Sequence, residues 1–335
     1  FSGFSGLTPA QLNALSRMNH SVLIRAPPAS EFFKALTGVY LAFFIVAAIL
    51  TLIVTVVCMK MIVEVFLKIK NEYVQVDLYW LLSSPMVVCW ICFLGICFPR
   101  SSGVLYAIGL TIVVMALATT CTLFARLYGG RKGLTEYMLS HNRQLEFATK
   151  PLCCCCSCLP VMTPTLRNVR LIHLLVDQTP FVRITLAIAL IIISMEGSPL
   201  NDPAITTLNI IGVVSTLIAV YAAQIIIELG DNDLAESGFD LLFKYMNLAQ
   251  TVYSLQRFIL DQIGRNNGFP ELPPMTPETV STFWFNVAMI GWYTVISISL
   301  AIRIRPGKSS LFDEQKYNKS TRTRVTIEQP QITQI

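Results

Sequence analysis

The feature that most constrains this chain is a nearly unbroken apolar run from Leu36 to Met59. A helix needs only about 20 such residues to cross the roughly 30 Å hydrocarbon layer of a bilayer. Charged residues make up only 13% of the chain, against about 25% in an average soluble domain. The sequence lacks the short strands of alternating hydrophobicity that are typical of an outer-membrane barrel. Six more apolar blocks follow, at 78–98, 103–124, 180–195, 204–227, 239–263 and 280–302.

We therefore expect an all-α membrane protein with seven transmembrane helices across residues 36–302. The cytoplasmic loops of such proteins hold an excess of Lys and Arg. If the N-terminus lies outside, the inner segments hold 17 of the 25 basic residues and the outer segments hold 5. This predicts an extracellular segment 1–35 and a cytoplasmic tail 303–335. Asn19 begins an Asn-His-Ser sequon in the outer segment, so we expect it to be glycosylated.

Five of the 10 cysteines lie together in the predicted cytoplasmic loop 125–179. Zinc ligands are usually spaced two to four residues apart, and the cytosol disfavours disulfides. Cytosolic cysteines beside a membrane are typical acylation sites. We expect palmitoylation, with unmodified packing as the alternative. The residues are Cys153, Cys154, Cys155, Cys156 and Cys158.

The stretch 166–176 in the same loop alternates apolar residues with Arg167, Arg170 and His173. This pattern is typical of a basic amphipathic helix lying on an anionic inner leaflet. The alternative is that it forms the solvated start of the fourth span.

The sixth apolar block is unusual because polar residues recur through it at helical spacing. An ionised side chain that faces lipid costs at least about 2.5–3.5 kcal/mol near the bilayer centre. The stripe must therefore face water or other helices. It could line a groove with polar residues of the fifth and seventh spans, or form a hydrogen-bond network that holds these helices together. The stripe consists of Asp240, Lys244, Asn247, Thr251, Ser254 and Asp261, with Gln250 and Arg257 beside it.

Several function classes lack their motifs. The glycine-rich segment 129–133 does not have Walker spacing, and the three histidines are scattered. We expect no enzymatic activity, no cofactor, no metal site and no nucleic-acid partner. A seven-span receptor is a weaker alternative, because Ala125-Arg126-Leu127 replaces the rhodopsin-like acidic-Arg-Tyr motif and the last span has no proline.

One family combines these features. The run Cys153–Pro160 stands between Gly129-Gly130 and a basic helix, and it resembles the cysteine run of organic solute transporter alpha subunits. The segments 98–101 and 212–217 are similar to that family too. The resemblance implies a multi-pass plasma-membrane protein that moves bile acids, sterol conjugates and similar amphipathic anions down their gradients. It also implies a lipidated cysteine run, a small single-span beta-type subunit as partner, and homodimers. This chain departs from the family in a shorter cysteine run and a more charged sixth span.

Together these observations predict facilitated diffusion of an amphipathic organic anion through a groove between spans five to seven. Lys244 and Arg257 would attract the anionic group, and amides and hydroxyls would donate hydrogen bonds. The alternative is a membrane scaffold or trafficking regulator organised on lipids by the cysteine loop. The expected substrate-binding residues are Gln224, Lys244, Asn247, Gln250, Thr251, Ser254, Arg257, Asn286 and Tyr293.

Overall fold

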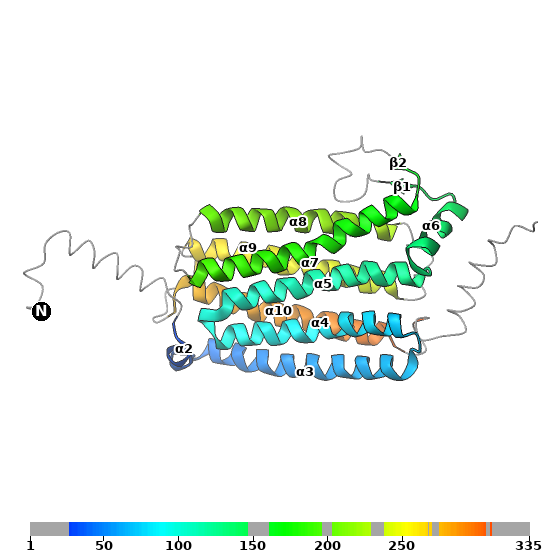
Figure 1. Cartoon of the computed structure of the whole chain (residues 1–335). Coiled ribbons are helices and arrows are strands. Elements are labelled where there is room, and N and C mark those ends of the chain that lie inside the picture. The colour runs from blue at the N-terminus through cyan, green and yellow to red at the C-terminus, as the bar shows by residue number, and fades with distance from the viewer. Residues whose placement is uncertain are drawn as a thin grey trace, which may run out of the picture.

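The structure, a computed structural model, describes residues 27–146, 161–195, 203–228, 238–266, 268–269, 275–305 and 309. Long helices run side by side through it as one bundle (Figure 1). Each apolar block of the sequence corresponds to one of them. They are α3 (Val39–Lys68), α4 (Glu72–Cys97), α5 (Ser102–Leu127), α7 (Leu166–Met195), α8 (Pro203–Glu228), α9 (Phe239–Arg265) and α10 (Pro277–Arg303).

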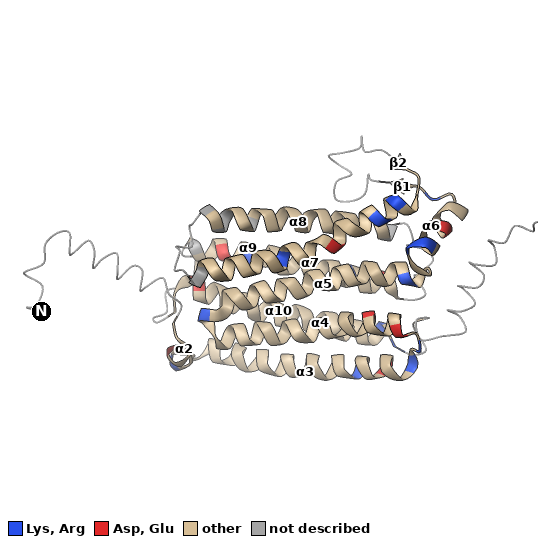
Figure 2. Ribbon diagram, in the orientation of Figure 1, with Lys and Arg blue, Asp and Glu red and all other residues tan. Residues whose placement is uncertain are grey.

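Five of these helices are long and apolar enough to cross a membrane: α3, α4, α5 with the turn before it, α7 and α10. In α8 the qualifying apolar stretch is shorter, Ile210–Ile226, and α9 does not qualify because its many polar residues lower its mean hydropathy. Charged residues are sparse along the middle of the bundle and gather at the end where α6 lies (Figure 2). The fold is thus an all-helical membrane bundle, as expected.

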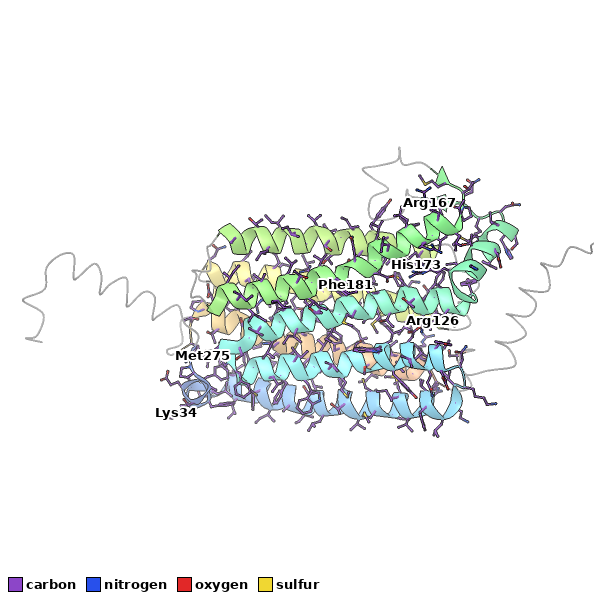
Figure 3. The ribbon with its side chains drawn as sticks, in the orientation of Figure 1. Lys34, Arg126, Arg167, His173, Phe181 and Met275 are labelled. Atoms are coloured by element: carbon purple, nitrogen blue, oxygen red, sulfur yellow. The ribbon has the colours of Figure 1, made fainter. Side chains whose placement is uncertain are left out.

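The smaller elements lie at the two ends of the bundle. At one end are α2 (Ala29–Ala35) and the 3₁₀ turn η1 (Pro99–Ser101), and at the other is α6 (Gly130–Ser140). Lys34 and Met275 mark the first end, and Arg126 and Arg167 mark the second (Figure 3). The sequence had not predicted α2 or α6.

Two short strands flank the cysteine run. β1 (Leu145–Glu146) pairs antiparallel with β2 (Val161–Met162), so the two ends of the intervening segment meet. The five cysteines themselves lie outside the described residues, as does Asn19. The described cysteines of the spans are free thiols, and four of the five are buried.

The helix α5 occupies the centre of the bundle. It packs against α4, α7 and α9, with smaller contacts to α8 and α6. On one side of it α3, α4 and α10 pack on one another, and on the other side α7 packs on α8. In an apolar stretch of 18 residues, only 22% of α3 and 17% of α7 are buried inside the bundle. These two helices therefore present most of their surface to the surroundings of the bundle.

Pro85 lies inside α4 without ending it. The proline cannot donate to the carbonyl of Leu81, and the Ser84 hydroxyl donates to that oxygen instead, at 2.9 Å.

The basic amphipathic stretch 166–176 is not a separate interfacial helix. It is the first part of α7, which continues without a break through Pro180. Val169, Ile172 and His173 are buried in protein, so this stretch packs on its neighbours along one side. This outcome matches the alternative interpretation, in which the stretch begins the fourth span.

Candidate functional site

Arg257 on α9 is the centre of a cluster that joins three helices. Its side chain is only 17% exposed and forms an ion pair with Asp261 one turn later, at 2.9 Å. Its Nη1 donates to the Thr282 hydroxyl on α10, at 3.2 Å. The guanidinium group also lies over two rings, 5.2 Å from the centroid of Tyr106 and 5.3 Å from that of Phe285. Cation–π contacts of this kind stabilise a desolvated arginine.

The rings beneath Arg257 form an aromatic cage of Tyr106 on α5, Tyr253 on α9 and Phe285 on α10. Tyr106 and Tyr253 are stacked, with centroids 5.2 Å apart and planes 8° apart. Phe285 meets both edge-on, at 5.7 and 5.3 Å. The Tyr253 hydroxyl donates to the Tyr106 carbonyl at 3.3 Å. The cage therefore fixes the position of Arg257 relative to α5 and α10.

The polar stripe of α9 continues from Arg257 toward the other end of the helix. Asn247 Oδ1, both polar atoms of Gln250 and Ser254 Oγ are buried, with no hydrogen-bond partner among the described residues. The Tyr293 hydroxyl on α10 shares this state. Buried polar groups in proteins are usually paired. Atoms in the same state also occur on α4, α7 and α8, and the five on α9 and α10 lie on adjacent helices.

Two expected site residues of α9 lie apart from this cluster. The Lys244 side chain is 66% exposed and forms an ion pair with Asp240 at 2.8 Å. It stands thirteen residues before Arg257, which is about 20 Å along the helix. Thr251 is exposed, and its hydroxyl donates to the carbonyl of Asn247. The helical period placed these two residues in the polar stripe. It did not show that they are exposed whereas Arg257 is mostly buried.

The site residues that we expected on α8 and α10 also lie apart from one another. Asn286 on α10 is buried against α4, where a side chain at Gly95 would lie 2.9 Å from its Nδ2. Gln224 is half-buried on α8, whose main packing partners are α7 and α5. The principal contacts of α9 are with α5 and α10. Spans five to seven therefore do not form one packing unit among the described residues.

The bundle contains a second arginine, and the sequence analysis had not assigned this residue to the site. Arg183 on α7 is half-buried and donates through Nε to the Thr216 hydroxyl on α8, at 3.0 Å, and through Nη2 to the same oxygen. Thr216 in turn donates to the Gly212 carbonyl at 2.8 Å. Among the described residues Arg183 has no acidic partner. A lone arginine inside an apolar block was the signal that could have revealed it.

Comparison with known proteins agrees with this membrane bundle. The family model described as "Organic solute transporter Ostalpha" matches residues 24–302. Organic solute transporter alpha-like protein 1 of Caenorhabditis elegans is 28% identical over 247 residues, which cover 73% of this chain and 64% of the relative. Alpha-like proteins 3 and 2 of the same organism are 24% and 21% identical, each covering 86% of this chain and 83% and 85% of the relative.

No solved structure matches the chain. The chain spans slightly less than two thirds of the first relative's length. The family match nevertheless takes in every described long helix except the last residue of α10. The cysteine run, the apolar blocks and the helical bundle thus converge on one assignment: this chain belongs to the organic solute transporter Ostalpha family.

Proposed function

We propose that this protein is a facilitative transporter of amphipathic organic anions, such as sterol conjugates and bile-acid-like solutes. It resides in the plasma membrane, with all seven long helices spanning it, the N-terminus outside and the C-terminus in the cytoplasm. The helices α8 and α9, of 26 and 27 residues, are each about 40 Å long. They match the spanning helices beside them, and Gln250 and Arg257 of α9 are turned toward protein.

The observation that carries this function is the set of buried, unpartnered polar atoms on α9 and α10. Buried polar groups that have no partner among the described residues are suited to meet a passing solute or water. In a purely structural bundle each of them would cost about 1–3 kcal/mol without return. Gln250, Ser254 and Tyr293 therefore line the path, and they offer hydrogen bonds to hydroxyls on an amphipathic solute.

Arg257 supplies the charge that selects an anion. Its pairing with Asp261 and its aromatic cage hold the guanidinium in place inside the membrane. A solute carboxylate or sulfate that approaches can accept charge-assisted hydrogen bonds from it. Lys244, exposed near the opposite end of α9, attracts the same solutes at the mouth of the path. The gradient of the solute drives the movement.

The accessory features belong to the same proposal. The segment between β1 and β2 carries palmitoylated cysteines and contacts membrane lipids, and Asn19 carries a glycan. A small single-span beta-type subunit and a second copy of the chain are the proposed protein partners.

The test is uptake of radiolabelled estrone sulfate into proteoliposomes that contain the full chain, with and without co-purifying small single-span protein. We expect saturable flux in both directions without ATP or an ion gradient. Arg257→Gln should abolish most of this flux. Lys60→Gln, on an exposed side chain of α3, is the matched loss of one positive charge and should leave it unchanged.

Two results would contradict the proposal. Folded protein that gives no flux with or without the small protein would favour the scaffold role. Full flux in Arg257→Gln protein of normal abundance would remove Arg257 from the path. Ligand-dependent G-protein turnover would instead favour the receptor alternative.

A further inference from the structure

Arg183 is a cation in an apolar setting whose charge the described residues do not neutralise. It sits in the middle of α7, seventeen residues after the helix begins at Leu166. Its hydrogen bonds go to a neutral hydroxyl on α8, not to a carboxylate. Its guanidinium can approach α8 closely because residue 212 is glycine, since a Cβ there would lie 2.7 Å from Nη1.

The hydrogen bonds of Arg183 leave part of its guanidinium available. Both bonds to Thr216 use Nε and Nη2, and among the described residues no hydrogen bond holds Nη1. A guanidinium has five N–H groups in a planar fork, and two parallel ones can bind both oxygens of a carboxylate or sulfate. Thr216 fixes the plane of the fork by holding one side of it.

We propose that Arg183 and Thr216 form a site for the headgroup of an amphipathic monoanion. The sulfate or carboxylate accepts hydrogen bonds from the part of the Arg183 guanidinium that Thr216 does not hold, and it balances the positive charge of Arg183. The apolar body of the solute lies along the apolar surfaces of α7 and α8. This inference rests on the proposed function, and it identifies the residues that recognise the charged group of the solute.

Direct binding tests the site without requiring transport. The full chain in nanodiscs of neutral lipid is titrated with tritiated estrone sulfate and, separately, with tritiated estrone, its uncharged parent. Arg183→Gln should weaken estrone sulfate binding at least about tenfold, because a charge-assisted bidentate contact is lost. Its affinity for estrone should not change. Thr216→Val should weaken estrone sulfate binding by a smaller factor, about threefold.

Arg183→Lys separates charge from structure. It keeps the positive charge and should bind estrone sulfate more tightly than Arg183→Gln, although without the planar fork it should not reach the wild-type affinity. Lys60→Gln controls for a general loss of positive charge and should behave as wild type.

The outcomes distinguish the site from the function. Wild-type affinity of Arg183→Gln for estrone sulfate, in protein whose transport is intact, would overturn the site and leave the function standing. Equal loss of estrone and estrone sulfate binding in Arg183→Gln and Arg183→Lys would show a structural role and also overturn it. Wild-type protein that neither binds nor moves estrone sulfate would overturn both.

Discussion

The Tyr253 hydroxyl on α9 fills the space that a side chain at Gly109 on α5 would occupy. Tyr253 is fully buried, and its ring is part of the aromatic cage. The two helices can bring Tyr253 this close to the backbone of α5 only because residue 109 has no Cβ. This contact sets the distance between the central helix and the helix that carries Arg257.

Gly109→Ala should therefore lower the free energy of unfolding by about 1–3 kcal/mol through overpacking. Thermal unfolding of the purified protein in detergent measures it. Gly103→Ala, on the same helix with no atom near its added Cβ, should have no such effect. Tyr253→Phe removes the clashing oxygen and should restore part of the loss in the double variant. Equal melting temperatures for the two alanine variants would show that α5 and α9 are not held at this distance.

A second prediction concerns the ion pair between Asp77 on α4 and Arg126 on α5, at 2.7 Å. The Asp77 side chain is only 8% exposed, whereas that of Arg126 is 35% exposed. Asp77→Asn should cost about 2 kcal/mol, less than the roughly 3–5 kcal/mol of a fully buried pair, because Arg126 can regain water.

Lys60→Gln is the matched control for that pair. It breaks a surface pair with Glu64 at 3.9 Å and should change stability by less than about 0.5 kcal/mol. In a double-mutant cycle, Asp77→Asn with Arg126→Gln should be less destabilised than the sum of the single variants. Strict additivity would mean that the pair contributes nothing.

The third prediction separates stability from transport at Gln250. The side chain is 1% exposed and both its polar atoms lack partners among the described residues. Gln250→Leu should raise the melting temperature, because it removes an unpaired polar group worth about 1–3 kcal/mol. The same variant should reduce estrone sulfate uptake. A stabilised variant with full uptake would exclude Gln250 from the path, and a destabilised one would mean that its polar atoms are satisfied.

The fourth prediction fixes the orientation. If the N-terminus lies outside, Asn19→Gln should remove a mass shift that a glycosidase also removes from the wild-type protein. A tag after residue 335 should be accessible to antibody only in permeabilised cells. A tag that stains on intact cells would reverse the topology.

The fifth prediction concerns the cysteine run. Replacing Cys153, Cys154, Cys155, Cys156 and Cys158 with Ser should remove a hydroxylamine-sensitive acyl label that the wild-type protein carries. Replacing the four buried cysteines of the spans (Cys58, Cys89, Cys92, Cys121) should not, because buried thiols are inaccessible to acylation. An unchanged label in the first variant would contradict lipidation of the run.

The sequence predicted the long helices because apolar length is a local property, which needs no knowledge of neighbours. It did not predict which side chains of different helices contact one another. The period of α9 places Lys244 and Arg257 near one stripe, but period alone does not show that one is exposed and the other caged. The aromatic cage depends on α5 lying beside α9, and nothing in the order of the chain indicates that contact.

The hydrogen bond from Tyr253 to the Tyr106 carbonyl joins residues 147 positions apart, and this separation has a consequence for biogenesis. Helices enter the membrane in order of synthesis, so the central helix must wait for three later ones before its polar face is covered. Until then Gly109 and Tyr106 are open to whatever else the membrane holds. A chain cut short before Phe239 would keep that face open permanently and present it to the chaperones and proteases that survey newly made membrane proteins.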